Sequence, residues 1–110
     1  MNQITWNNDL EPAITLDSVF VYAGHTMLVG IFEDETCDDI SWECASTSSV
    51  TLEGGTYPKH FAEIEACDLL SEEIISGKDS VDNAQDMANV IRKNVTRLIA
   101  QGFFQEVGKN

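Results

Sequence analysis

The sequence predicts an α+β fold, in which an antiparallel sheet of about 3–5 strands carries a long C-terminal helix, and a shorter preceding helix, on one face. Two observations predict this fold. Residues 17–32 form a β-branched and aromatic stretch that is broken by a turn signal, and residues 80–101 carry apolar side chains at helical spacing. A chain of 110 residues has room for one core but not for two, so residues 1–110 are expected to form a single globular domain.

The stretch from Ser80 to Gln101 has the clearest helical pattern. Its apolar and small residues recur at alternating spacings of three and four, which places them on one helix face. They are Val81, Ala84, Ala88, Ile91, Val95, Leu98 and Gly102, widened by Met87, Val90 and Ile99. Asp79 or Ser80 is the predicted N-cap, and Gly102 is the predicted stop.

The segment Asp17–Phe32 predicts the central hairpin of the sheet. Gly24-His25 separates two apolar runs and fits a two-residue turn of type II′. Both faces of the two strands are apolar, which is typical of the interior of a sheet. Gly30 within the second strand indicates a bulge or a close backbone approach. Two shorter strands, residues 39–46 and Ser48–Glu53, are expected to form a second hairpin.

The segment Tyr57–Gly77 allows two interpretations. Its composition favours one long helix. However, its apolar residues scatter right round a helical wheel, and the alternation of Ala62, Ile64 and Ala66 with acidic and thiol side chains is typical of a strand followed by a short helix. Both interpretations stay open.

Charge is the outstanding bulk property of the chain. Nineteen acidic residues against six basic ones give a net charge of −13. No Lys or Arg precedes Lys59, and six of the ten carboxylates in residues 1–58 lie between Glu33 and Glu43. One interpretation is solubility or an acidic proteome from a salty habitat, and the other is a surface that meets a positively charged partner.

The expected location is the cytoplasm. No apolar run reaches the ~18 residues that would span a membrane, and the first residues lack the basic start and apolar centre of a signal peptide. Three cysteines are an odd number, which argues against a disulfide framework.

Catalytic and cofactor chemistry is not indicated. Zinc accepts three thiols and an imidazole, but six residues separate Cys37 from Cys44 and six separate His60 from Cys67, wider than structural zinc pairs. No oxyanion loop surrounds a cysteine, and the acidic segment lacks the periodicity of a calcium loop. Direct binding of nucleic acid is disfavoured because carboxylates repel phosphates. We therefore predict no enzyme activity, no metal and no cofactor.

The predicted partner-binding surface is the acidic segment around Trp42. Carboxylates there would steer a basic protein, and the indole would anchor it. The alternative is that Trp42 belongs to the core, with solvated acids around it. The predicted contact residues are Glu33, Asp34, Glu35, Asp38, Asp39, Trp42 and Glu43.

In composition the chain is similar to immunity proteins of nuclease toxins and to phage-type DNA mimics: small, strongly acidic and poor in motifs. The likeness implies an inhibitor that binds the basic surface of a nuclease, toxin or defence-system protein. The alternative is a small-molecule- or metal-binding domain, or a small enzyme, with a pocket between sheet and helix. Its expected lining is Phe20, Tyr22, Phe61, Phe103 or Phe104. A subunit of a larger assembly, such as a virion, also stays open.

Overall fold

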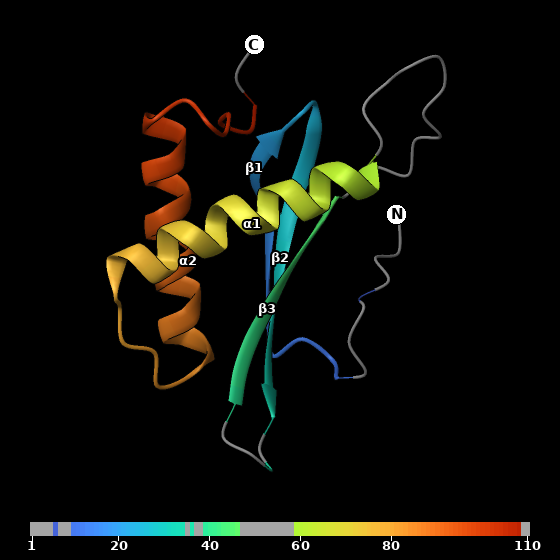
Figure 1. Cartoon of the computed structure of the whole chain (residues 1–110). Coiled ribbons are helices and arrows are strands. Elements are labelled where there is room, and N and C mark those ends of the chain that lie inside the picture. The colour runs from blue at the N-terminus through green and yellow to red at the C-terminus, as the bar shows by residue number, and fades with distance from the viewer. Residues whose placement is uncertain (1–5, 7–9, 35, 37–38, 47–58, 109–110) are drawn as a thin grey trace.

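The fold consists of a three-stranded antiparallel sheet followed by two helices. The computed structural model describes residues 6, 10–34, 36, 39–46 and 59–108, without the side chains of residues 59 and 60. The strands are β1 (Ile14–Tyr22), β2 (His25–Asp34) and β3 (Asp39–Ser46), in the order β1-β2-β3. The helices are α1 (Lys59–Gly77) and α2 (Ala84–Ala100). Figure 1 shows α1 crossing the strands and α2 beside it, which confirms the α+β fold.

The turn between β1 and β2 lies one residue earlier than the sequence analysis placed it. Ala23 (φ 51°) and Gly24 (φ 83°) both lie in the left-handed region, and Tyr22 pairs with His25. Positive φ at both central residues is the type I′ geometry, whose twist matches that of the flanking strands. The type II′ turn predicted at Gly24-His25 is therefore wrong.

The hairpin is not central as a whole, because only β2 has a strand on each side. β1 is an edge strand, and its Val21 exchanges two backbone hydrogen bonds of 2.9 Å with Gln105 of the C-terminal segment. A bulge interrupts β1 between Leu16, which pairs with Val29, and Phe20, which pairs with Met27. The extra residues include Ser18, whose φ is 52°.

The main core lies between the sheet and both helices. Met27, Val29 and Ile31 of β2 are fully buried on this face. Phe20 stacks on Phe104 with ring centroids 3.9 Å apart, which closes one end of the core.

Gly30 and Phe32 lie on the opposite face of β2, where Trp6 covers them. The Trp6 ring meets Phe32 edge to face at 5.6 Å between centroids. A Cβ on Gly30 would come within 2.8 Å of the same ring. The close approach at Gly30 is thus made by a side chain, the Trp6 ring, and not by a second backbone segment as predicted.

α2 confirms the predicted apolar stripe but begins later than predicted. Asn83 is the N-cap, since its side chain accepts a hydrogen bond of 2.8 Å from the backbone N–H of Asp86. The cap predicted at Asp79 or Ser80 is therefore wrong. Gly102 (φ 87°) follows the C-cap and ends the helix as predicted. The buried residues of α2 are Ala84, Met87, Ala88, Val90, Ile91, Asn94, Val95 and Leu98.

Residues 59–77 form one continuous helix, so the interpretation as a strand followed by a short helix is wrong. With 19 residues against 17 in α2, α1 is slightly the longer of the two helices. Neither helix has the length and apolar character needed to cross a membrane, as far as the described residues go. The strand predicted at Ser48–Glu53 lies outside the described residues.

Candidate interaction surface

The predicted acidic contact segment spans the end of the β2–β3 hairpin. Asp34 pairs with Asp39 across the two strands, next to Glu33, and we call these three residues the hairpin end. Asp34 also holds the turn, because the N–H and the hydroxyl of Thr36 both donate to its Oδ1, at 3.0 and 2.6 Å. Two further predicted contact residues, Glu35 and Asp38, lie outside the described residues.

Glu33 has a structural contact that the sequence did not reveal. Its Oε1 accepts a hydrogen bond of 2.6 Å from the backbone N–H of Ala84, the first residue of α2. The first N–H groups of a helix lack intrahelical partners, and negative charge is favourable there. Glu33 therefore joins β2 to the start of α2, where Asn83 supplies the N-cap.

Trp42 and Glu43 do not form one surface with each other. Trp42 is half-buried and packs, with Ile40 and Cys44, against the core under the helices. Glu43 pairs with Gly30 and, as the next residue in the strand, points to the opposite face. Trp42 therefore packs against the core on the face of the sheet that also carries Glu33, whereas Asp34, Asp39 and Glu43 lie on the opposite face.

A second acidic surface, which the sequence analysis did not single out, runs along α1. Six exposed side chains fall within roughly 100° of arc on the helical wheel. They are Phe61, Ile64, Glu65, Asp68, Glu72 and Ile75, and we call them the outer α1 face. Exposure of its apolar members is large, at 56% for Phe61, 46% for Ile64 and 71% for Ile75.

The opposite side of α1 is fully occupied by the fold. Glu63 Oε2 accepts a hydrogen bond of 2.6 Å from the backbone N–H of Ser46, which attaches the helix to β3. Glu73 Oε1 lies 3.7 Å from a guanidinium nitrogen of Arg97 in α2. The residues of α1 that are fully buried in the core are Ala62, Ala66 and Leu70. The acids of α1 therefore divide into inner ones, Glu63 and Glu73, which contact β3 and α2, and outer ones on the exposed face, of which Glu65 contacts β1.

The sequence did contain a signal for this surface. The apolar residues of 61–75 scatter round the wheel because some of them face outward rather than into the core. A helix that already buries apolar residues on its inner face appears weakly amphipathic when it also carries apolar residues on its exposed face. The scatter marks the exposed isoleucines rather than a break in the helix.

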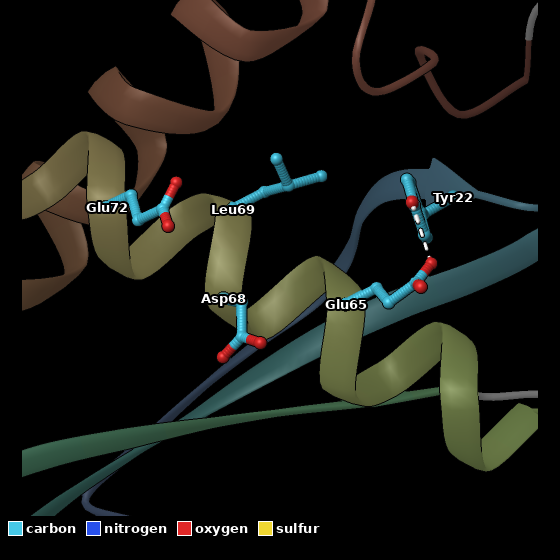
Figure 2. Close-up of a pocket in the computed structure, with 5 residues that line it drawn as sticks. All are labelled: Tyr22, Glu65, Asp68, Leu69 and Glu72. Carbon is cyan, nitrogen blue, oxygen red and sulfur yellow. Dashed lines mark hydrogen bonds between the residues drawn. The ribbon is translucent and has the colours of Figure 1, made fainter.

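An open pocket of about 270 Å³ lies where the outer α1 face meets the end of β1. Figure 2 shows Tyr22 reaching Glu65 from β1, and the phenol O–H donates to Glu65 Oε1 at 3.1 Å. Burial, and then the hydrogen bond to Glu65 and its charge, raise the pKa of Tyr22 above its ordinary 10.0. Leu69 supplies apolar lining, and Asp68 and Glu72 add two carboxylates. The pocket joins an aromatic ring, an aliphatic side chain and three acids.

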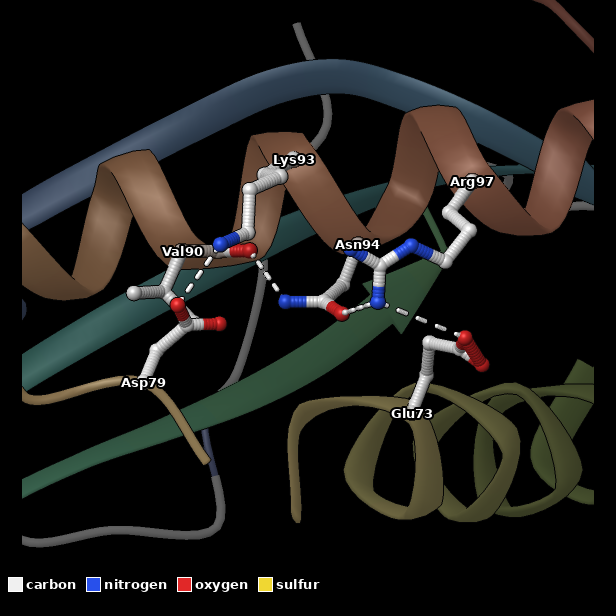
Figure 3. Close-up of polar contacts among 6 residues, drawn as sticks. All are labelled: Glu73, Asp79, Val90, Lys93, Asn94 and Arg97. Atoms are coloured by element: carbon white, nitrogen blue, oxygen red, sulfur yellow. Dashed lines mark hydrogen bonds and ion pairs between the residues drawn. The ribbon is translucent and has the colours of Figure 1, made fainter. Parts of the chain in front are cut away.

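Two of the three cations of α2, Lys93 and Arg97, face acids at the junction with α1. Lys93 Nζ lies 2.6 Å from Oδ1 of Asp79. Figure 3 shows this contact and shows Arg97 between Glu73 and Asn94. Asn94 is completely buried; its Nδ2 donates to a backbone carbonyl one turn earlier at 2.7 Å, and its Oδ1 accepts from Arg97 at 3.4 Å. These contacts neutralise Glu73 and Asp79, which both lie off the outer α1 face.

Cys44 and Cys67, the two cysteines that the structure describes, are not activated. Burial, followed by the neighbouring Cys67 thiol and the Glu63 carboxylate, raises the pKa of Cys44 far above its usual range. Burial is also the main cause that raises the pKa of Cys67. Across the part of the chain that the structure describes, no group of three or more His, Cys, Asp or Glu is placed to hold a metal ion. Two residues of the zinc hypothesis, Cys37 and the His60 side chain, lie outside that part.

Two of the aromatic residues that were expected to line a pocket between sheet and helix are instead packed in the core. Phe20 and Phe104 are buried and stacked on each other, whereas Phe103 is exposed. A different cavity, of about 320 Å³, lies between the bulge of β1 and α2. Its lining residues are Leu16, Asp17, Ser18, Val19, Arg92, Val95, Thr96 and Ile99.

Two surfaces and one cavity are thus the candidates for function: the hairpin end, the outer α1 face and the space beside the β1 bulge. Comparisons with models of known protein families, with curated proteins and with solved structures return no match.

Proposed function

We propose that the protein is a small, non-catalytic, cytoplasmic inhibitor that binds the basic surface of a nucleic-acid-handling protein. The target class is a nuclease, toxin or defence-system protein whose site is built to hold a polyanion. Carboxylates compete for such a site because they place negative charge where phosphates would lie. The long-range attraction between opposite net charges also speeds the encounter.

The observation that carries this proposal is the unneutralised charge of the outer α1 face. The ion pairs Lys93–Asp79 and Arg97–Glu73 lie at the junction of α1 and α2, and neither involves Glu65, Asp68 or Glu72. Even if every Lys and Arg of the chain neutralised one carboxylate, thirteen carboxylates would remain. Such an excess costs stability through self-repulsion, and a basic partner would relieve it.

The experiment begins with immobilised full-length protein and an extract of its native host. Retained proteins are identified and purified, and binding is then measured with the two purified components. We expect a basic, nucleic-acid-handling partner whose affinity falls steeply as salt rises and which duplex DNA displaces. The activity of that partner on nucleic acid should fall in proportion to the fraction bound. A partner that binds equally well at low and high salt, or that binds DNA and this protein at the same time, would contradict the proposal.

The cavity beside the β1 bulge favours a second candidate function, the binding of a small molecule. It combines an apolar floor, formed by Leu16, Val95 and Ile99, with the guanidinium of Arg92 and the hydroxyl of Thr96. Asp17 also lines the cavity, so the matching ligand is an apolar carboxylic acid whose carboxylate meets Arg92 rather than Asp17. A set of aromatic and aliphatic carboxylates, titrated into isotopically labelled protein, tests the idea. Saturable changes in the amide chemical shifts of residues 16–19 and 92–99, abolished by Arg92→Gln, would support ligand binding in this cavity. Without such changes, this second function would be excluded.

A further inference from the structure

We infer that the outer α1 face receives an amphipathic basic helix of the partner, with an Arg or Lys side chain of that helix seated in the Tyr22 pocket. This inference rests on the proposed function and specifies which surface makes the contact and what the partner presents to it. It moves the main contact from the hairpin end, which the sequence favoured, to α1.

Four residues of the outer α1 face form two parallel ridges, and Phe61 and Asp68 lie between these ridges on the wheel. At about 100° per residue, Ile64 and Ile75 lie only about 20° apart on the wheel, and so do Glu65 and Glu72. About 80° separates the apolar pair from the acidic pair. Along the axis the isoleucines are roughly 16 Å apart and the glutamates roughly 10 Å apart. A partner helix with apolar residues along one side of its contact face and cations along the other side matches both ridges.

The Tyr22 pocket is suited to a long cationic side chain. Lys and Arg bury their aliphatic stems against apolar surface while the charged end stays among polar groups. Leu69 and the Tyr22 ring provide the apolar lining, and Glu65, Asp68 and Glu72 provide the negative charge. The hydrogen bond from Tyr22 holds the Glu65 carboxylate in place before binding, which lowers the entropy lost on association.

Other occupants of this face are disfavoured by the same charges. A second copy packed on it about a two-fold axis would place Glu65, Asp68 and Glu72 against their own counterparts. Anionic lipid and nucleic acid would meet the same repulsion. At the hairpin end two of the three carboxylates, Glu33 and Asp34, make hydrogen bonds within the fold, whereas on the outer α1 face one of the three, Glu65, does so.

The probe is a synthetic helical peptide with Leu on one side of its contact face and Arg on the other, compared with a scrambled peptide of the same composition. Each is titrated into isotopically labelled full-length protein. The amphipathic peptide is expected to shift amide signals of residues 61–75 and of Tyr22, and to bind at least about tenfold more tightly than the scrambled peptide. Such a difference arises when only one peptide can use both ridges.

Three triple or double variants locate the contact. Glu65→Gln/Asp68→Asn/Glu72→Gln should weaken peptide binding about tenfold, as expected for three exposed charge pairs. Ile64→Gln/Ile75→Gln should weaken it by a similar factor without changing the net charge. The control Glu11→Gln/Asp17→Asn/Asp82→Asn removes the same amount of charge elsewhere on the surface and should change the affinity by less than about twofold. Circular dichroism and urea unfolding establish that each variant is folded.

Three outcomes would overturn the inference: equal affinity of the two peptides, equal losses in the outer-face and control variants, or signal shifts confined to residues 33–43. None of them touches the proposed function, which is judged by the host partner and its competition with DNA. If the host partner binds and these peptides do not discriminate, the function stands and the outer α1 face is excluded as its site.

Discussion

The carboxylate of Glu33, at the end of β2, accepts a 2.6 Å hydrogen bond from the backbone N–H of Ala84, the first residue of α2. Glu33 was predicted from the sequence to contact a partner protein. In the structure it stabilises the start of a helix fifty-one residues later in the chain. Glu33→Ala should lower the free energy of unfolding by about 1–2 kcal/mol, as the loss of a charged helix cap does.

Urea unfolding of Glu33→Ala and of Asp39→Asn measures this effect. Asp39 is exposed and faces Asp34 across the hairpin. Its neutralisation should therefore not lower the free energy of unfolding, because it removes the repulsion between two like charges. Equal stability of Glu33→Ala and the parent protein would show that the hydrogen bond to α2 is not stabilising.

A second prediction concerns Gly30 and the Trp6 ring. A Cβ at position 30 would lie 2.8 Å from two atoms of that ring, so Gly30→Ala should cost about 1–3 kcal/mol through overpacking. Removal of the ring should remove the clash. In a Trp6→Ala background, Gly30→Ala should therefore cost much less, and a double-mutant cycle of urea unfolding measures the difference. If Gly30→Ala lowers the stability equally in both backgrounds, the destabilisation arises within the strand and not from a clash with the indole.

A third prediction concerns acid and the ion pair between Asp79 and Lys93. The hydrogen bond from Lys93, aided by its charge, by Asn94 and by Arg97, holds the pKa of Asp79 below its ordinary 3.8 despite partial burial. A carboxyl whose pKa is lower in the folded state stabilises the protein above its unfolded pKa. That stabilisation is lost as the pH falls through the folded pKa.

The stability difference between the parent and Asp79→Asn should therefore be constant near neutral pH and should vanish at acidic pH, below the folded pKa of Asp79. Urea midpoints across an acidic pH series provide the measurement. In a Lys93→Gln background, Asp79→Asn should have a smaller effect at neutral pH. A difference that persists unchanged below the folded pKa would show that the charge of Asp79 is not what stabilises the fold.

The half-buried thiols of Cys44 and Cys67 provide a fourth prediction. Each unit by which burial raises a cysteine pKa removes about tenfold of the reactive thiolate at a given pH. Cys44 and Cys67 should thus react slowly with iodoacetamide in the native protein and rapidly in urea. Pulse labelling followed by mass spectrometry of the two peptides measures both rates. Rapid native labelling of Cys44 would contradict its burial between β3 and α1.

The sequence predicts the local features of this fold better than the long-range ones. The apolar stripe of α2 and the stop at Gly102 follow from residues within a few turns of one another, and both were predicted. The N-cap was misplaced because Asp79, Ser80 and Asn83 are all chemically suitable caps, and only the tertiary structure selects among them. The turn was misplaced because an alanine at positive φ is unfavourable and is not expected from the sequence. The type I′ turn nevertheless forms at Ala23-Gly24 because its twist matches that of the two strands.

The candidate site was less predictable, for a physical reason. Charge density along the sequence marks the hairpin end, but it does not show which carboxylates the fold uses. Glu33 contacts α2, while Glu63 and Glu73 attach α1 to β3 and α2, and these partners are distant in sequence. The outer α1 face becomes apparent only when these internal carboxylates are set aside.

The most direct test of the account is the rate at which three variants associate with the purified host partner at low and at high salt. The variants are the outer-face variant Glu65→Gln/Asp68→Asn/Glu72→Gln, its charge-matched control Glu11→Gln/Asp17→Asn/Asp82→Asn, and the hairpin variant Asp34→Asn/Asp38→Asn/Asp39→Asn. All three remove the same net charge, so any difference among them reports where the charge acts.

Stopped-flow mixing at two salt concentrations gives the association rate constant of each variant. The account predicts that the outer-face variant associates about tenfold more slowly at low salt and loses most of its salt dependence, since local charge complementarity governs steering. The control variant should stay within about twofold of the parent, and the hairpin variant should fall between the two. An equal slowing in all three variants would show that only the total charge matters, and unchanged association of the outer-face variant would contradict the account directly.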